Sequence, residues 1–385
     1  MYMLRAGSAL ALLVLIGVAS PSPVDNGLAR TPPMGWNSWN HFGCNVSEKL
    51  IEEEADAIAA SGMRDAGYRY VVIDDCWQVA RNAQGVIVAD SARFAHGIKA
   101  LADYVHSKGL KFGIYTDAGT LTCQRRPGTL GHEEQDARTY AAWGVDYVKE
   151  DWCHAEQLVA PTQYARFRDA LAHSGRQIVF SICEWGSNQP WEWAPTVGNL
   201  WRTTDDIEDK WPSMLSNLDQ DGQHASAARP GAWNDPDMLE VGNGGMTDDE
   251  YRAHFSLWAI LAAPLMAGHD VRTMSPATKE ILLNREVIAV DQDSLGKQGM
   301  LVWEPTPELQ VWSKPLADGA HAVALLNRSA TPAKITAYLS RVGLRTDSAT
   351  VRDLWAHADR GRVRREYAVE VPAHAVVMVK MTPVR

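Results

Sequence analysis

The sequence has few cysteines, a deficit of positive charge and no apolar run long enough to cross a membrane. Its 385 residues include 5 cysteines, far fewer than a small disulfide-stabilised scaffold needs. Lys and Arg total 37 against 47 Asp and Glu, so we expect no broad basic surface and no nucleic acid partner. The composition, 46% hydrophobic and 22% charged, is that of one or two ordinary folded domains.

The longest apolar run lies near the N-terminus and has the features of a secretory signal peptide. It spans 11 residues, 9–19, whereas a transmembrane helix needs about 20. Arg5 precedes it, and the small residues Ala19 and Ser20 follow before Pro21. We expect a signal peptide over residues 1–20, with an approximate cleavage site, and a secreted mature chain, periplasmic or extracellular, without membrane attachment. An uncleaved anchor is the less favoured alternative.

Between residues 28 and 293 the sequence repeats a helical pattern, a glycine and a short run of β-forming residues. Ile98, Leu101 and Val105, for example, have helical spacing that ends at Gly109, and an extended run leads from there to Asp117. Eight such runs occur, near 34–39, 68–75, 110–117, 145–151, 177–182, 200–206, 231–237 and 261–266. This number predicts an α/β fold of the (β/α)8 TIM barrel type. An open doubly wound sheet would more often have five or six strands and a glycine-rich phosphate turn.

The last part of the chain, residues 294–385, has a different pattern. It contains seven short β-rich runs without helical spacing, at 300–303, 309–313, 321–326, 333–339, 350–354, 366–371 and 375–381. Turn residues separate these runs, which indicates a small antiparallel β-sandwich domain. We interpret this domain as structural, with carbohydrate binding as a minority alternative.

Acidic and aromatic residues collect where the predicted barrel strands end. The set comprises Trp39, Asp74, Asp75, Tyr115, Asp117, Lys149, Asp151, Glu184, Arg202, Asp206 and Asp237. The carboxyl ends of the strands form the face where such barrels place their active sites. Glycoside hydrolysis is the commonest reaction that needs only two positioned carboxylates and a shaped pocket. No Gly-x-Ser-x-Gly motif occurs, so we expect no serine nucleophile. The histidines are scattered, so we also expect no metal and no cofactor. A metal-dependent reaction is a weak alternative.

Two acidic segments suggest opposite chemical roles. The strand alternation puts Lys149 and Asp151 on one face, where the cation would favour an ionised carboxylate suited to a nucleophile. Asp205 and Asp206 are adjacent, and a neighbouring negative charge can raise the pKa of a carboxyl group, as a general acid requires. From spacing alone, a structural salt bridge is at least as frequent an explanation for either pair.

Tryptophan is abundant, with 15 residues. Seven of them lie at or beside predicted strand ends: Trp36, Trp39, Trp77, Trp152, Trp185, Trp201 and Trp233. A flat apolar ring suits the C–H face of a sugar. Tryptophan is usually mostly buried, however, so we expect about half of these residues to belong to the core.

From about residue 28 to the C-terminus, the chain resembles glycoside hydrolase family 27, the melibiase-type alpha-galactosidases and alpha-N-acetylgalactosaminidases. The matching motifs are Thr31–Trp39, Ile73–Trp77, Gly113–Tyr115, Lys149-x-Asp151-x-Cys153, Cys183–Trp185, Trp201-Arg202 followed by Asp206, and Trp233–Met238. The resemblance implies a (β/α)8 barrel followed by an antiparallel β domain. It also implies a retaining alpha-galactosidase acting on oligosaccharides or galactomannan.

The resemblance also assigns roles to residues. Asp151 would be the nucleophile and Asp206 the acid/base of a double displacement. Galactose would be bound by Trp39, Asp74, Asp75, Tyr115, Lys149, Glu184, Arg202 and Asp237. The acids at 74 and 75 would hold the 4- and 6-hydroxyls, which favours galactose over arabinopyranose. Glu184 and the bulky Trp185 would leave no room for an N-acetyl group at C2.

The family pattern implies disulfides between Cys44 and Cys76 and between Cys123 and Cys153. Cys183 would then be a free thiol near the pocket, because residues 197–200 contain no partner for it. Glu150 departs from the family pattern, and the strand alternation points it away from the pocket. The remaining functional alternatives are an alpha-N-acetylgalactosaminidase, a beta-L-arabinopyranosidase and a non-catalytic galactose-binding protein.

Overall fold

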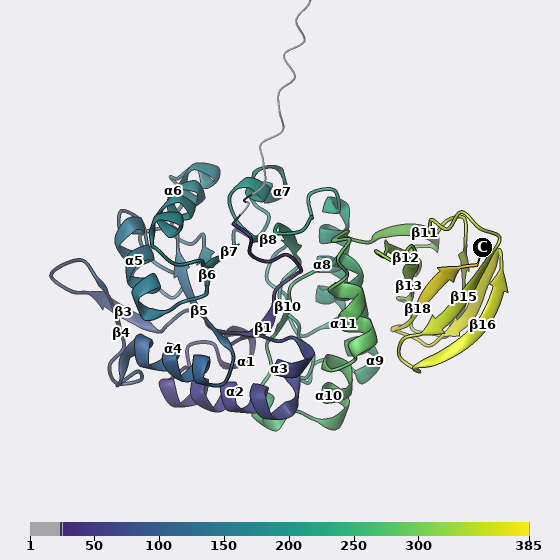
Figure 1. Ribbon diagram of the computed structural model, residues 1–385, viewed down its shortest axis with the longest axis horizontal. Coiled ribbons are helices and arrows are strands. Elements are labelled where there is room, and N and C mark those ends of the chain that lie inside the picture. The colour runs from purple at the N-terminus through teal and green to yellow at the C-terminus, as the bar shows by residue number, and fades with distance from the viewer. Residues whose placement is uncertain (1–23, 25, 385) are drawn as a thin grey trace, which may run out of the picture.

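The computed structural model describes residues 24 and 26–384, so the predicted signal peptide at 1–20 lies outside the described residues. The purple-to-green part of the chain forms a curled sheet surrounded by helices, and the yellow C-terminal strands form separate antiparallel sheets beside it (Figure 1). Among the described residues, every helix is too short or too polar to span a lipid bilayer.

Eight parallel strands form the curled sheet, in the order β10-β1-β2-β5-β6-β7-β8-β9. They are β1 (Met34–Asn37), β2 (Tyr70–Ile73), β5 (Lys111–Asp117), β6 (Tyr147–Asp151), β7 (Val179–Ile182), β8 (Leu200–Arg202), β9 (Trp233–Asp235) and β10 (Leu265–Ala267). An isolated parallel bridge joins Leu239, which lies beyond the end of β9, to Ala267 of β10. The architecture confirms the predicted TIM-barrel class, and its register places Tyr115 beside Lys149 and Asp117 beside Asp151.

Eleven α-helices among the described residues surround this sheet. They are α1 (Trp39–Phe42), α2 (Glu48–Ser61), α3 (Met63–Ala66), α4 (Gly97–Ser107), α5 (Glu133–Trp143), α6 (Ala160–His173), α7 (Pro190–Trp193), α8 (Trp211–Asp221), α9 (Asp248–Leu261), α10 (Pro276–Leu282) and α11 (Arg285–Asp291). Short 3-10 turns span Ala194–Thr196, Gly222–His224 and Val271–Thr273. The Ser47 side chain caps the N-terminus of α2, which ends at the left-handed Gly62.

A β-hairpin that the sequence pattern did not predict projects from the barrel. It consists of β3 (Gln78–Arg81) and β4 (Ile87–Ala89), which pair in antiparallel fashion. The two terminal guanidinium nitrogens of Arg81, Nη1 and Nη2, donate to the Asp136 carboxylate on α5, at 2.7 and 2.5 Å. This bidentate pair fastens the hairpin to the helix layer.

The C-terminal part contains a six-stranded antiparallel sheet, in the order β11-β12-β13-β18-β15-β16, and a two-stranded sheet, β14-β17. The strands are β11 (Met300–Thr306), β12 (Leu309–Pro315), β13 (His321–Asn327), β14 (Ala333–Tyr338), β15 (Ser348–Asp353), β16 (Ala358–Arg364), β17 (Glu366–Val371) and β18 (Ala375–Pro383). The predicted sandwich is confirmed with one additional strand, β16. That strand is arginine-rich because it lies at the sheet edge, where charged side chains discourage pairing with other chains.

The two parts of the molecule share buried contacts. Trp312, Leu326 and Met378 of the C-terminal sheet belong to the same apolar cluster as the barrel helices. The buried Lys314 ammonium donates to the backbone oxygens of Ala259 in α9 and Asp291 in α11, at 3.1 and 3.2 Å. Burial lowers the pKa of Lys314 to about 8, although the Asp291 carboxylate opposes this shift.

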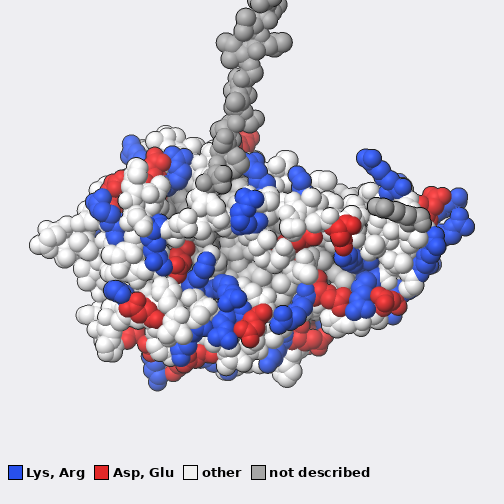
Figure 2. Space-filling view, viewed as in Figure 1, with Lys and Arg blue, Asp and Glu red and all other residues white. Residues whose placement is uncertain are grey.

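In the face shown in Figure 2, basic side chains lie among acidic ones.

Candidate active site

A cavity of about 450 Å³ opens at the carboxyl ends of the barrel strands. Its size is within the range of small-molecule sites. Ten of the eleven residues predicted to act on or bind substrate line it: Trp39, Asp74, Asp75, Tyr115, Lys149, Asp151, Trp185, Arg202, Asp206 and Asp237. The eleventh, Glu184, does not. The structure therefore brings together side chains that the sequence spreads over about 200 residues, because parallel strands end at the same face of the barrel.

Asp151 ends β6 and is 6% exposed. Its carboxylate accepts hydrogen bonds from the Tyr115 hydroxyl and the Trp152 backbone N–H, both at 2.9 Å. Burial raises the pKa of Asp151 to about 6, against the opposing effects of Lys149 and Tyr115. Lys149 favours the ionised carboxylate, as the sequence predicts, but desolvation of the carboxylate has the larger effect.

Lys149 forms a direct ion pair with Asp74, which follows β2, two strands away from β6 in the sheet. Its ammonium lies 2.9 Å from Oδ2 of Asp74, which also accepts from the Asn37 amide at 2.8 Å. Burial is the largest single effect and would lower the pKa of Lys149, but Asp74, Cys183, Asp151 and Asp237 together outweigh it, so the pKa is raised. The cavity wall thus carries a preformed ion pair that can donate to and accept from hydroxyl groups.

Asp75 lies next to this ion pair and is held by the backbone. Its two carboxylate oxygens accept from the N–H groups of Cys76 and Gln124, at 2.6 and 3.0 Å. Burial raises the pKa of Asp75, and these hydrogen bonds oppose the shift. The two acids at the end of β2 therefore have different partners although they are adjacent in sequence.

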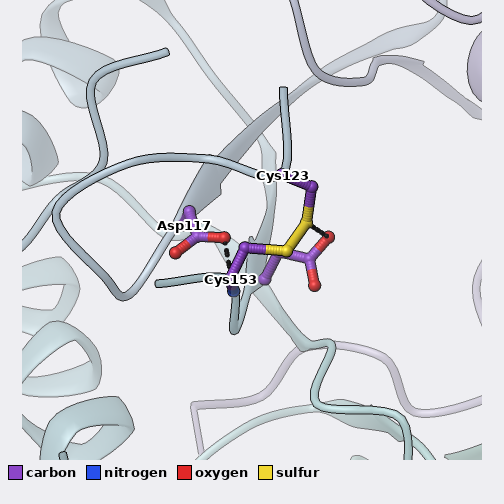
Figure 3. Close-up of side chains that lie close together, drawn as sticks. Asp117, Cys123 and Cys153 are labelled. Atoms are coloured by element: carbon purple, nitrogen blue, oxygen red, sulfur yellow. Dashed lines mark hydrogen bonds between the residues drawn. A yellow bond between two sulfur atoms is a disulfide. The ribbon is translucent and has the colours of Figure 1, made fainter. Parts of the chain in front are cut away.

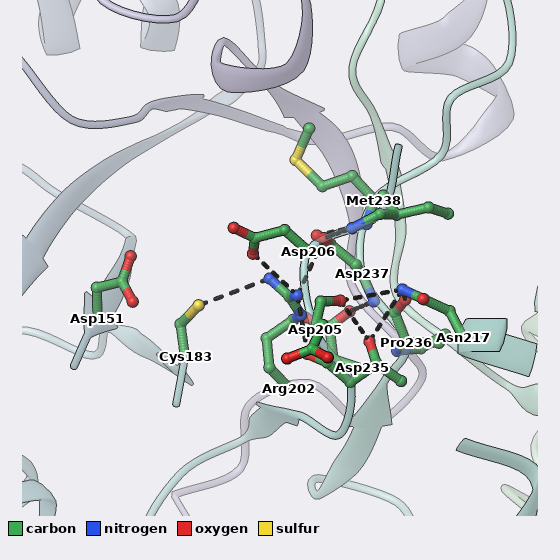
Figure 4. Close-up of polar contacts among 12 residues, drawn as sticks. Asp151, Cys183, Arg202, Asp205, Asp206, Asn217, Asp235, Pro236, Asp237 and Met238 are labelled. Carbon is green, nitrogen blue, oxygen red and sulfur yellow. Dashed lines mark hydrogen bonds and ion pairs between the residues drawn. The ribbon is translucent and has the colours of Figure 1, made fainter. Parts of the chain in front are cut away.

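Asp206 lies on the loop after β8, with its side chain 71% exposed. Its Oδ1 is 3.1 Å from Nη2 of Arg202, and the same nitrogen is 3.1 Å from Oδ2 of Asp237. Figure 4 shows Asp151 at the left of the view and Asp206 near its centre, with the Cys183 side chain drawn between them. The charged group that the Asp206 carboxylate contacts is thus the Arg202 guanidinium.

Glu184 was predicted to bind substrate, but the structure directs it elsewhere. It is fully buried, and one of its oxygens accepts from the backbone and side-chain nitrogens of Asn188 at 2.6 and 2.7 Å. Burial raises its pKa to about 7. The chain turns sharply here, with Trp185 in the left-handed region at φ 56°, so that the tryptophan and not the glutamate lines the cavity.

The tryptophans divide much as expected between core and pocket. Trp36, Trp77, Trp201 and Trp233 are fully buried. Trp152 is partly buried against the same apolar core. Trp39 and Trp185 line the cavity, where their rings are available to a ligand.

Two residues of the cavity wall have left-handed backbone conformations. These are Trp185, at φ 56°, and Asp237, at φ 84°. Such conformations are costly for residues other than glycine and often occur at functional sites. At Asp237 the turn lets one carboxylate accept from the backbone N–H groups of Ile207 and Met238, both at 2.8 Å.

Both cysteine pairs implied by the family resemblance, Cys44–Cys76 and Cys123–Cys153, form disulfides in the structure, and Cys183 is a free buried thiol. Asp117, Cys123, Asp151 and Cys153 bring potential metal ligands within 4.8 Å of one another (Figure 3). The two sulfurs are bonded to each other, however, and a metal needs thiolates. Asp117 has a structural role in this group, since it accepts from the Cys153 N–H at 2.8 Å.

Sequence reasoning missed several residues of the cavity rim. They are Asn40, His41, Cys123, Ile207, Glu208, Asp209, Met238, Glu240 and Asn243. Most follow a predicted strand end by a few residues, which is the only signal that could have found them. Glu240 binds Asn40 and accepts from Asn243 at 2.6 Å, and burial raises its pKa to about 7.

The barrel and the C-terminal sheets each match a described protein family. Residues 31–293 match the family model described as alpha galactosidase A, and residues 306–381 match the alpha galactosidase C-terminal beta sandwich domain. Alpha-galactosidase from Coffea arabica is 55% identical over 361 residues, which is 93% of this chain and 95% of that protein. Alpha-galactosidase 2 from Arabidopsis thaliana is 52% identical over 369 residues, with 95% and 93% covered.

Solved structures show the same similarity. Alpha-galactosidase I from Mortierella vinacea has a TM-score of 0.90 and 40% identity, covering 94% of this chain and all of that one. The Saccharomyces cerevisiae alpha-galactosidase solved with raffinose has a TM-score of 0.88 and 30% identity, with 94% and 100% covered. The chain therefore belongs to glycoside hydrolase family 27, the melibiase-type alpha-galactosidase family, and is a glycoside hydrolase.

Proposed function

We propose that this glycoside hydrolase is an exported, retaining alpha-galactosidase that removes terminal alpha-linked D-galactose from oligosaccharides or galactomannan. Alpha-galactosidase activity is supported by the relatives described above. The observation that carries the mechanism is that Asp151 and Asp206 line one cavity with different surroundings, one buried and one at the rim. Two carboxylates in such a pocket suffice for glycoside hydrolysis.

In the first step, the Asp151 carboxylate attacks C1 of the galactosyl group while Asp206 donates its proton to the departing glycosidic oxygen. A β-linked galactosyl ester forms as the C1–oxygen bond breaks. In the second step, Asp206 takes a proton from water, which attacks C1 and releases Asp151, so that α-galactose results. With a pKa of about 6, Asp151 is mostly ionised at neutral pH, and the Tyr115 and Trp152 hydrogen bonds orient it for attack.

The buried polar groups would recognise the sugar. The Lys149–Asp74 pair and Asp75 would bind the 4- and 6-hydroxyls, and a site built to bond a hydroxyl strongly rejects a sugar that lacks it. This favours galactose over an arabinopyranose. Trp39 would pack against the sugar, and Trp185 would block an N-acetyl group at C2.

We further propose that residues 1–20 direct secretion and that the mature chain comprises a catalytic barrel at 28–293 and a β domain at 294–385. The two disulfides suit an oxidising compartment, since such bonds rarely persist in the cytosol. The partner would be a galactoside alone, without nucleic acid or membrane attachment.

Substitution of each carboxylate tests the assignment. Asp151→Gly and Asp206→Gly should each abolish hydrolysis of melibiose. Azide should then rescue Asp151→Gly on an activated aryl galactoside and give β-galactosyl azide, because azide enters the space left by the nucleophile. In Asp206→Gly, azide should give the α-azide, because it attacks the galactosyl ester. Galactose binding without any turnover in the native protein would instead indicate a sugar-binding protein.

A further inference from the structure

Asp206 is carried by residues 203–210, an irregular segment that we call the acid/base loop. The carboxylate is at the exposed rim of the cavity, where packing alone cannot fix it. A proton donor must nevertheless be held within hydrogen-bonding reach of the leaving oxygen. The contacts that restrain this loop therefore decide how well Asp206 can act.

The first half of the loop is tied to the barrel. The Asn217 amide on α8 donates to the backbone oxygens of Asp205 and Pro236, at 3.1 and 2.9 Å (Figure 4). The Ile207 N–H donates to the Asp237 carboxylate at 2.8 Å. These bonds restrain the residues on both sides of Asp206 but not the far end of the loop.

The far end is fastened by a separate contact that the proposed reaction does not use. The Tyr251 hydroxyl lies 2.9 Å from both carboxylate oxygens of Asp209, and the Gly245 N–H donates to the same carboxylate at 2.5 Å. The Tyr251 oxygen also accepts from the Gly244 N–H at 2.6 Å. One tyrosine thus joins the acid/base loop to the loop between β9 and α9.

Tyr251 is itself held in place by its position in a capped helix and by burial. It lies in the first turn of α9 and is 4% exposed. A capping box between Thr247 and Glu250 fixes this end of the helix. The fit is tight at Gly245, where a Cβ atom would lie 2.1 Å from the Asp209 backbone oxygen, so only glycine allows the loops to meet.

We propose that Tyr251 is a positioning residue that holds Asp206 in place for proton donation, acting through Asp209. The proposal rests on the proposed function, in which Asp206 is the acid/base. Removal of the hydroxyl leaves the Asp209 carboxylate with the Gly245 N–H as its remaining hydrogen bond, so the end of the loop three residues beyond Asp206 loosens. The nucleophile on β6 has no part in this contact.

The leaving group distinguishes this role from a general structural one. A sugar alkoxide departs only when protonated, whereas an acidic phenol such as dinitrophenol departs without help. The ratio kcat/KM reports the first step alone, in which Asp206 acts as an acid. Misplacement of Asp206 should therefore slow melibiose hydrolysis and leave dinitrophenyl α-galactoside hydrolysis almost unchanged.

The test compares kcat/KM on these two substrates for the full-length enzyme and its Tyr251→Phe variant. We expect a loss of about ten- to hundredfold on melibiose, since misplacement by 1 Å can cost that much. On the dinitrophenyl galactoside we expect a change of less than about threefold, because no proton is needed. Tyr104→Phe is the matched control, since it removes a hydroxyl that donates to Asp56 at 2.9 Å on the outer surface. It should alter neither substrate's kcat/KM.

Two results would overturn the proposal: equal losses on both substrates, which mean a structural role, or no loss on melibiose. Thermal unfolding of Tyr251→Phe shows whether the variant is folded, and Asp209→Asn, which keeps the side-chain shape, should reproduce the selective loss in milder form. The Asp206→Gly variant tests the acid/base assignment separately. If its kcat/KM falls equally on melibiose and on the aryl galactoside, the acid/base assignment fails as well. If its loss is confined to melibiose and that of Tyr251→Phe is not, only the positioning role of Tyr251 fails.

Discussion

Removal of the Lys149 charge should move the acidic limb of the pH profile. Asp151 must be ionised to attack, so kcat/KM should rise with pH through the pKa of Asp151, about 6. Burial raises this pKa and Lys149 is the first of the groups that oppose the rise. Lys149→Met keeps an apolar stem of similar length but removes the ammonium. The pKa of Asp151 should therefore rise further.

The size of the shift follows from the setting of the charge. An opposite charge close to a buried carboxyl changes its pKa by about one to three units. We expect the acidic limb of Lys149→Met to lie about one to two pH units above that of the native enzyme. The assay is kcat/KM against pH from 4 to 9 on an aryl galactoside with an acidic phenol, which keeps proton donation from shaping the profile.

The absolute activity of Lys149→Met will also fall, because Asp74 loses its partner and sugar binding weakens. The position of the limb is independent of that loss. Lys99→Met is the control, since Lys99 pairs with Asp103 on the exposed surface of α4 and should leave the limb in place. An unchanged limb in Lys149→Met would refute the electrostatic account of Asp151.

Three further predictions concern stability and specificity. Lys314→Met should lower the free energy of unfolding in urea by about 3–5 kcal/mol, because the buried Asp291 carboxylate loses its opposing charge and two buried backbone oxygens lose their donor; a loss below about 1 kcal/mol would contradict this. Trp185→Ala should raise kcat/KM for an aryl α-N-acetylgalactosaminide relative to the galactoside by about tenfold or more, since the wall at C2 is removed; an unchanged ratio would contradict it. Calorimetry should show the unfolding temperature rising as the pH falls from about 8 to about 5, and a falling value would contradict the raised carboxyl pKa values. Burial raises the pKa of Glu54 to about 8 and of Glu240 to about 7, so the native state binds more protons than the unfolded state in this range.

The barrel could be predicted from the sequence because its strands are short apolar runs that end in polar residues. Edge elements were harder to predict. Strand β16 is rich in arginine, and β3 and β4 are short and partly exposed, so neither has the apolar alternation of a half-buried strand. Their pairing partners, not their composition, make them strands.

The site was predictable where a strand end fixes the direction of a side chain, and not beyond it. Asp151 ends its strand and lines the cavity as expected. Glu184 lies just past the end of β7, where the turn at Trp185 reverses the pattern. The Lys149–Asp74 pair and the Asp209–Tyr251 contact join residues 75 and 42 positions apart, and only the folded chain reveals them.

The most direct measurement is the identity of the residue that carries the sugar during turnover. A 5-fluoro-α-D-galactosyl fluoride should form an ester that breaks down slowly enough for proteolysis and peptide mass spectrometry. We expect a single fluorogalactosyl group on Asp151. A label on another residue, or steady turnover of the reagent without a covalent ester, would contradict the claim that Asp151 is the nucleophile of a double displacement.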